Sequence, residues 1–130
     1  MDMMKILVVD DNLEYLALLK EALTIAGYDV QTAADGVEGC EKLSSEQIDL
    51  IISDIRMPRL DGIKLHAFAR EIDRHKGTKF VFITGFKEMY SHIPGFDAKV
   101  DFFLEKTTPV RTIIQMVDSL VFGKFAEQWT

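Results

Sequence analysis

The stretch KILVVDDN, residues 5–12, joins an unbroken apolar run to two adjacent carboxylates. The continuous run from Ile6 to Val9 is typical of a strand that is covered on both faces, as in a parallel sheet. Asp10 and Asp11 repel each other and resist transfer out of water, so their position at the end of such a strand requires a compensating partner. The stretch therefore predicts a buried strand with a functional site at its carboxyl end.

The composition predicts one globular domain. The chain has 130 residues, of which 48% are hydrophobic and 28% charged, as in folded proteins. Its formal charge of −6 disfavours direct nucleic-acid binding, and no apolar stretch is long enough to span a bilayer. The one cysteine, Cys40, has no partner for an intrachain disulfide, which fits a reducing compartment. We therefore expect a cytoplasmic domain that binds neither membrane nor nucleic acid directly.

Short apolar segments alternate with longer amphipathic ones along the chain. The expected strands are residues 5–9, 28–33, 48–53, 79–84 and 100–104. The expected helices are residues 12–26, 36–45 and 62–75, and a last helix that begins after Thr108. Five βα units in order predict a right-handed, doubly wound α/β domain with helices on both faces of a parallel sheet.

Local signals predict where several of these helices begin and end. Asn12 and Thr108 are the expected caps of the first and last helices, with Pro109 at the first helical position. Between the fourth and fifth strands, Pro94 and Gly95 leave room for about two helical turns at most. The residues expected on inner helix faces are Leu16, Leu19, Leu23, Ala26, Val37, Cys40, Leu43, Leu65, Phe68, Ala69, Ile72, Val110, Ile113, Ile114, Val117 and Val121. The three histidines, His66, His75 and His92, are too scattered for a metal site and are expected at the surface or partly packed.

Polar residues follow the apolar strands at the points where functional groups collect in such sheets. Asp10 and Asp11 follow the first strand, and Asp54 follows the third. Thr84 ends the fourth strand, and Lys106 follows the fifth. If the first and third strands are neighbours, three carboxylates meet at one edge of the sheet, with a hydroxyl and an ammonium beside them.

This set of groups predicts a cation site and phosphoryl chemistry. Two like charges about 4 Å apart repel by roughly 1 kcal/mol in water and about 4 kcal/mol at an effective dielectric of 20, and a hard divalent cation such as Mg²⁺ removes that repulsion. Asp54 can then attack a phosphoryl group as a nucleophile, while Lys106 and Thr84 stabilise the transferring oxygens.

Four motifs carry a resemblance to a known family. They are VVDDN at 8–12, SDIRMPRLDGI at 53–63, FITG at 82–85 and FFLEK at 102–106. With these motifs the chain, from about residue 4 to 121, resembles the receiver domain of a bacterial two-component response regulator. The resemblance implies a flavodoxin-like fold of strand order 2-1-3-4-5. It also implies a phosphorylation-controlled switch that takes its phosphoryl group from a sensor histidine kinase or a phosphotransfer protein.

The resemblance implies a role for each matched residue. Asp54 would be the phosphorylated residue, and Asp54 and Asp11 would bind Mg²⁺ directly. Asp10 would act through metal-bound water, and the backbone carbonyl of Arg56 would be a further ligand. Lys106 would pair with the phosphoryl group.

The resemblance also implies a switch pair, Thr84 and Phe103, whose hydroxyl and ring respond to the phosphoryl group. Among the departures from the family pattern, two concern the backbone. Thr107 follows Lys106 where the family usually has a proline after a cis bond, which leaves the geometry at Lys106 open. The break at Pro94 and Gly95 falls where the family normally continues a fourth helix. We expect phosphorylation to change the conformation between Gly85 and Phe103, and this segment to be the most mobile part of the unphosphorylated domain.

The expected domain covers residues 1–122, and residues 123–130 form an extension or the start of a linker. Past the domain, Phe125 and Trp129 continue the spacing of Val117 and Val121. One interpretation is a tail that folds back on the domain. The other is a lengthened last helix that presents aromatic residues to a second copy or to a downstream partner. An attached output domain and a separate docking partner are equally compatible with the sequence.

Three other functions compete with the switch, which is not a turnover enzyme in the usual sense. A Mg²⁺-dependent phosphatase that works through an aspartyl phosphate generally needs an acid two residues beyond the nucleophile, where this chain has Arg56. A flavin-binding electron carrier needs a phosphate-binding loop after the first strand, where DDNLEY would repel a phosphate. A receiver that binds partners without being phosphorylated usually lacks one of the acids or the lysine.

Overall fold

The sheet has five parallel strands in the order β2-β1-β3-β4-β5. The computed structural model describes residues 3–85 and 92–123 of the chain. The strands are β1 (Lys5–Val9), β2 (Asp29–Ala33), β3 (Leu50–Asp54), β4 (Lys79–Thr84) and β5 (Asp101–Glu105). The doubly wound sheet and the strand order are therefore confirmed, and each strand lies within two residues of its expected position.

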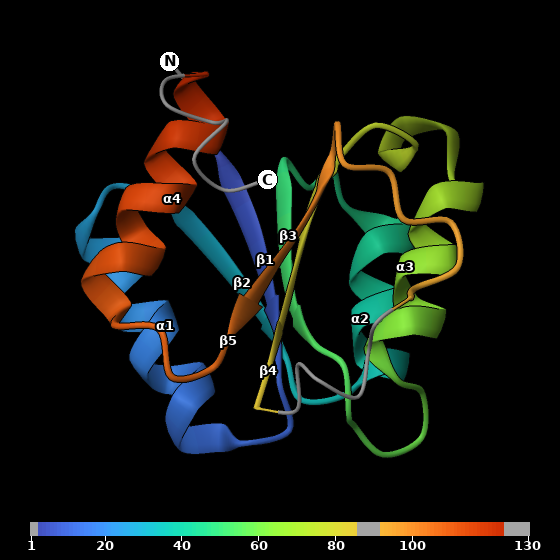
Figure 1. The fold of residues 1–130 in the computed structure, drawn as a ribbon, viewed down its shortest axis with the longest axis horizontal. Coiled ribbons are helices and arrows are strands. Elements are labelled where there is room, and N and C mark those ends of the chain that lie inside the picture. Colours follow the sequence, from blue (N-terminus) through green and yellow to red (C-terminus); the bar gives the residue numbers. More distant parts are fainter. Residues whose placement is uncertain (1–2, 86–91, 124–130) are drawn as a thin grey trace.

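Helices cover both faces of this sheet (Figure 1). On one face lie α1 (Leu13–Ile25) and α4 (Val110–Phe122), and on the other lie α2 (Gly36–Ser45) and α3 (Gly62–Glu71). Each face has its own core, because neighbouring residues of a strand point to opposite sides. Ile6 and Val8 of β1 pack towards α1 and α4, whereas Leu7 and Val9 pack towards α2 and α3.

Side-chain caps fix where three of the helices begin. The Asn12 side chain accepts hydrogen bonds from the backbone N–H groups of Glu14 and Tyr15, as the sequence predicts. Asp35 and Asp61 cap α2 and α3 in the same way. The prediction for α4 was wrong by one residue: Pro109 itself occupies the cap position, and no side chain caps this helix.

The third helix ends earlier than its apolar pattern suggests. Ile72 has an extended backbone with ψ of 120°, so α3 stops at Glu71 and a 3-10 turn, η1 (Asp73–His75), follows.

The expectation that the histidines lie near the surface was wrong for two of them. His66 and His75 are buried, because each ring nitrogen Nε2 has a buried hydrogen-bonding partner.

The inner faces of α1 and α4 differ in detail from the expected stripes. Leu16, Leu19 and Leu23 of α1 are buried, but Ala26 is exposed because it forms the C-cap. In α4 the buried residues are Ile113, Met116, Val117 and Leu120, while Val110, Ile114 and Val121 lie at the edge of the core and are half-buried.

Two predictions fall partly or wholly outside the described residues. The two helical turns expected between Gly85 and Pro94 fall mostly on residues 86–91, which lie outside the described residues, and residues 92–100 include turns and bury Ile93. The aromatic tail residues Phe125 and Trp129 also lie outside the described residues, so both interpretations of the tail stay predictions.

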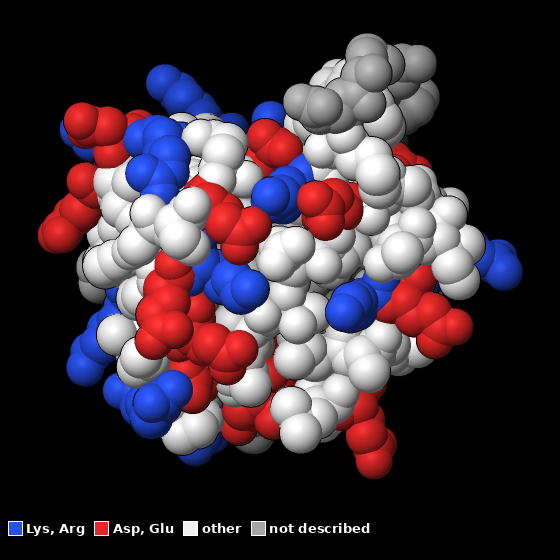
Figure 2. All heavy atoms as spheres, turned by 180° about the vertical axis from the view of Figure 1, so that it is seen from behind, with Lys and Arg blue, Asp and Glu red and all other residues white. Residues whose placement is uncertain are grey.

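None of the helices in the described ranges is long and apolar enough to cross a membrane. On the face turned away from Figure 1, acidic and basic side chains are interspersed (Figure 2).

Candidate metal and phosphoryl site

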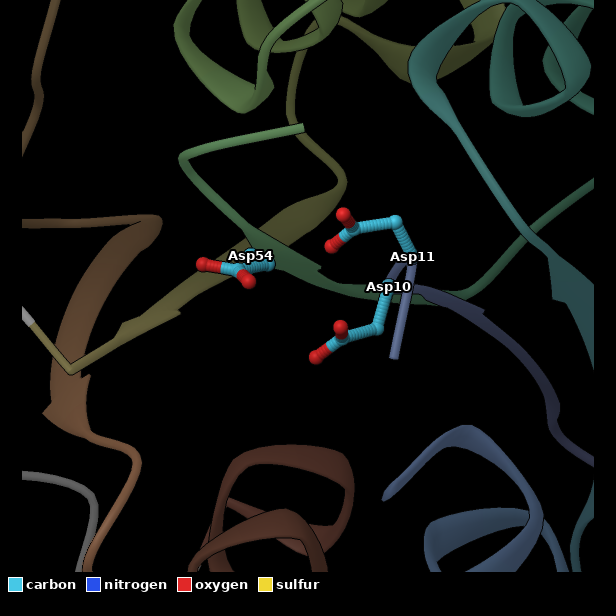
Figure 3. Close-up of side chains that lie close together, drawn as sticks. All are labelled: Asp10, Asp11 and Asp54. Atoms are coloured by element: carbon cyan, nitrogen blue, oxygen red, sulfur yellow. The ribbon is translucent and has the colours of Figure 1, made fainter. Parts of the chain in front are cut away.

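Three carboxylates meet at the carboxyl ends of β1 and β3 (Figure 3). Val9 pairs with Ser53 in the sheet, so the residues that follow each, Asp10 and Asp54, come level. Asp10, Asp11 and Asp54 each offer an oxygen, and these oxygens all lie within 4.8 Å of one another. Asp10 and Asp54 are buried, whereas Asp11 is exposed. The sequence prediction that these three acids converge is therefore confirmed.

Lys106 joins the two buried carboxylates. Its Nζ lies 2.8 Å from Oδ2 of Asp10 and 3.2 Å from Oδ2 of Asp54. The backbone N–H of Lys106 donates to the carbonyl oxygen of Thr84 at 2.9 Å, which continues the β4–β5 pairing to the site. The bond between Lys106 and Thr107 is trans, as are the other peptide bonds of the described residues, so the ammonium reaches the carboxylates without the family's proline.

The pKa values in the site reflect burial and mutual attraction. Burial raises the pKa of Asp54 and the neighbouring Asp10 raises it further, while Lys106 and a hydrogen bond from the Ile55 N–H offset only part of this. Burial alone would lower the pKa of Lys106, but hydrogen bonds and attraction from Asp10 and Asp54 outweigh burial and raise it. The site thus holds more negative charge than one ammonium compensates, and a cation would relieve the excess.

The residues present fit a hard divalent cation. The donors are carboxylate oxygens, which Mg²⁺ prefers. Asp10 is already engaged, since its Oδ1 accepts the Asn12 N–H at 2.8 Å and its Oδ2 pairs with Lys106. Asp11 has no such partner among the described residues and opens onto a surface pocket. This pocket is lined by Asp11, Ile55, Arg56, Met57, Pro58 and Asp61.

The loop after β3 is held close to the site by Gly62. The Gly62 N–H donates to the carbonyl oxygen of Ile55 at 2.8 Å. A Cβ at position 62 would lie 2.2 Å from the carbonyl oxygen of Asp54, closer than any side chain can approach. Arg59 in the same loop has a left-handed backbone with φ of 68°, and its guanidinium pairs with Asp35 at 2.6 Å. Glycine is therefore required where α3 begins, beside Asp54.

The two residues expected to form a switch lie at neighbouring strands. Thr84 is fully buried at the end of β4, one residue beyond Ile83, which pairs with Asp54. Phe103 lies in β5, is half-buried, and has its ring 6.4 Å from that of Phe82. Thr84 thus lies at the carboxyl edge of the sheet, whereas Phe103 is the middle residue of β5 and pairs with Phe82, two residues before Thr84.

Sequence reasoning missed one aromatic residue at this site. The Nζ of Lys106 lies 4.7 Å from the centroid of the Tyr15 ring. Tyr15 precedes Leu19 and Leu23 by four and eight residues on α1, so the helical spacing of those leucines could have placed it on the inner face.

A second buried charged cluster was also missed. Asp101 at the start of β5 is fully buried and accepts hydrogen bonds from His66 Nε2 at 3.0 Å and from Arg70 at 2.6 Å. It also accepts the backbone N–H of Asp97 at 2.8 Å. Burial would raise the pKa of Asp101, but these hydrogen bonds outweigh burial and lower it. Asp101 thus ties the turns at residues 92–100 to α3, and no motif in the sequence indicates this pairing.

Comparison with known proteins identifies the family. RpaA of Synechocystis sp., a DNA-binding dual master transcriptional regulator, is 32% identical over 92% of this chain and 49% of its own length. The chain thus spans about half the length of this curated relative. Among solved structures, chemotaxis response regulator CheY4 of Vibrio cholerae matches with a TM-score of 0.81 and 27% identity, over 92% of this chain and 99% of CheY4. Response regulator TrrA of Thermotoga maritima, solved in complex with Mg²⁺-BeF, matches with a TM-score of 0.77 and 30% identity, over 91% of this chain and 99% of TrrA. A sequence model of the response regulator receiver domain matches residues 6–118, and the chain therefore belongs to that family of phosphorylation-dependent signalling domains.

Proposed function

We propose that Asp54 is the residue that accepts the phosphoryl group, from a phosphohistidine of a sensor histidine kinase or a phosphotransfer protein. The observation that carries this proposal is the position of Lys106, whose Nζ lies 3.2 Å from Asp54 and 2.8 Å from Asp10. A fixed ammonium beside the carboxylate can stabilise the charge of a phosphoryl group during its transfer. Asp10 and Asp11 are less suited to this role, because Asp10 is only 1% exposed, against 7% for Asp54, and Asp11 has no ammonium beside it among the described residues.

The transfer forms one bond and breaks another. An oxygen of Asp54 attacks phosphorus, and the bond between phosphorus and the imidazole nitrogen of the donor breaks. The imidazole leaves with the electron pair and takes up a proton. Lys106 and the Thr84 hydroxyl donate hydrogen bonds to the phosphoryl oxygens.

Mg²⁺ fits the acidic side of the same site. Asp11, Asp54 and the backbone carbonyl of Arg56 would hold the ion directly, and Asp10 would do so through bound water. When bound, Mg²⁺ neutralises charge on the carboxylates and on the phosphoryl oxygens. Support comes from the oxygens of the three acids, which lie within 4.8 Å of one another, and from the pocket that Asp11 and Arg56 line.

The signal would pass through Thr84 and Phe103. A phosphoryl group adds about −1.5 to −2 charges and three acceptor oxygens, which can draw the Thr84 hydroxyl and Lys106 towards Asp54. Phe103 would then fill the space behind Thr84, and the turns at residues 92–100 would respond. The domain, residues 1–122, assists its own phosphorylation and dephosphorylation but is not a turnover enzyme. Its output is an attached domain, a docking partner or a second copy bound through the last helix.

Hydrogen exchange with beryllofluoride, a phosphoryl mimic, tests this function. In the presence of Mg²⁺ we expect added protection in peptides that contain Asp10, Asp11 and Asp54, and a change in the peptides between Gly85 and Phe103. The Asp54→Asn variant should show neither change. Protection confined to the peptides that contain the three acids would mean that phosphorylation does not change the segment between Gly85 and Phe103. No change at all would favour a receiver that binds partners without phosphorylation.

A further inference from the structure

Tyr15 lies at the phosphoryl site, but the transfer chemistry described above gives it no role. It is the third residue of α1, and its backbone N–H donates to the Asn12 side chain at 3.1 Å. This cap fixes the backbone of Tyr15 one helical turn after Asp11. The ring packs at the edge of the core between the sheet and the α1–α4 pair.

Among the described residues, the ammonium of Lys106 has three partners. Two are the carboxylates of Asp10 and Asp54, and the third is the face of the Tyr15 ring, 4.7 Å from Nζ. An ammonium within about 6 Å of a ring centroid is attracted by the electrons of the ring face, more strongly where water is excluded. Of these three partners, the two carboxylates can accept a proton from the ammonium and can also bind a metal ion. The aromatic face attracts the ammonium without doing either.

The hydroxyl of Tyr15 does not explain why the residue is there. It is buried and has no hydrogen-bond partner among the described residues, which is unfavourable for a polar group. Burial raises the pKa of this hydroxyl, and Asp10 and Asp54 raise it further, so Tyr15 remains neutral. The ring is therefore the part of Tyr15 that bears on the site.

We propose that Tyr15 is a positioning residue whose ring face holds the Lys106 ammonium at the Asp10–Asp54 carboxylate pair. This inference rests on the proposed function, in which Lys106 stabilises the transferring phosphoryl group. A lysine side chain has four rotatable bonds, so an ammonium that is already placed loses less freedom when the phosphoryl group arrives. Loss of the ring should therefore slow phosphorylation and leave Mg²⁺ binding unchanged.

The first test compares Tyr15→Leu with the matched variant Tyr15→Phe. With acetyl phosphate at saturating Mg²⁺, we expect Tyr15→Leu to lower the rate constant of phosphorylation by between about twofold and tenfold. Tyr15→Phe keeps the aromatic ring, and we expect it to be phosphorylated at the wild-type rate. In the Lys106→Met background, Tyr15→Leu should have no further effect, since the residue acts through Lys106. An equal loss in Tyr15→Phe, or a full additional loss in the Lys106→Met background, would overturn the proposal.

A second measurement uses the unphosphorylated wild-type protein and therefore needs no variant. In the wild-type protein, NMR should show the ε-methylene protons of Lys106 shifted upfield by the Tyr15 ring, with cross-relaxation between these protons and the ring protons. Unshifted protons without cross-relaxation would refute the positioning role whatever the rates are. A shifted signal in a protein that acetyl phosphate does not phosphorylate would instead refute the proposed function and leave the Tyr15–Lys106 contact established.

Discussion

The ammonium of Lys106 donates to Oδ2 of Asp54 at 3.2 Å, although the two residues are 52 positions apart in the chain. The contact places the only ammonium among the site residues at the proposed phosphoryl acceptor. Two consequences of opposite sign follow for a variant that lacks this charge, because Lys106 attracts the phosphoryl group but repels a metal ion.

In Lys106→Met, phosphorylation by acetyl phosphate should slow by roughly 10²-fold, the usual effect of removing one group that stabilises transition-state charge. Mg²⁺ should bind more tightly, because Asp10 and Asp54 lose their positive partner. Quench-flow kinetics and titration calorimetry measure the two effects. A variant that is phosphorylated at the wild-type rate, or that binds Mg²⁺ more weakly, would contradict the assignment of Lys106.

Mg²⁺ binding should depend on Asp11 more than on Asp10. Asp11 is exposed at the pocket, whereas both oxygens of Asp10 already have partners, Asn12 and Lys106. Asp11→Ala should weaken binding by roughly tenfold or more, because the variant loses a charged oxygen ligand that would contact the divalent ion directly. Asp73→Ala, at an exposed acid in η1, is the control for net charge. Equal, small losses in Asp10→Ala and Asp11→Ala, measured by calorimetry, would refute the site as drawn.

Asp101 should contribute strongly to the stability of the fold. Asp101→Ala leaves the buried His66 ring and the Arg70 guanidinium without their acceptor, and such losses typically cost about 3–5 kcal/mol. Asp97→Ala, at an exposed carboxylate in the same segment, should cost far less. Urea unfolding of the two variants gives the comparison, and similar losses would show that the cluster is not what holds residues 92–100 to α3.

His75 should make the fold sensitive to mild acid. Burial lowers the pKa of His75 below its ordinary value, and the charges of Arg74 and Arg70 lower it further. As the pH falls through about 6.5, the unfolded chain therefore binds a proton that the folded chain refuses, and the free energy of unfolding falls. The loss continues down to the lowered folded pKa.

The His75→Gln variant separates this effect from other titrating groups. An amide oxygen can accept the Ile48 N–H, as the His75 Nε2 does at 3.1 Å, but it does not titrate. Between pH 7.5 and 5.5, wild type should lose more unfolding free energy than His75→Gln, as measured by urea denaturation at each pH. Parallel loss in the two proteins would show that His75 is not the group responsible; His92→Gln, at an exposed histidine, is the matched control.

Most of the fold was predictable because its signals are local. The continuous apolar runs predicted buried parallel strands, whose carboxyl ends align. The neighbouring positions of β1 and β3, which bring Asp10, Asp11 and Asp54 together, were implied by the family resemblance. The buried histidines were not predictable in this way. His66 and His75 are accommodated by Asp101 and by the Ile48 backbone, partners that lie 35 and 27 residues away, and no spacing rule connects them.

The features of the site that escaped prediction depend on side-chain direction. The helical spacing places Tyr15 on the inner face of α1, but only the packed structure brings its ring beneath Lys106. The requirement for glycine at position 62 depends on the tertiary structure as well. The need for it becomes visible only when the carbonyl oxygen of Asp54 is found where a Cβ would lie.

The most direct test of the central claim is to locate the phosphoryl group. The protein is treated with acetyl phosphate and Mg²⁺, its intact mass is measured, and the acyl phosphate is then reduced with borohydride, which converts a phosphorylated aspartate to homoserine. Peptide sequencing by mass spectrometry should find homoserine at position 54 and at no other aspartate, and the Asp54→Asn variant should give no adduct. An adduct at Asp10 or Asp11, or one that persists in Asp54→Asn at wild-type stoichiometry, would contradict the account.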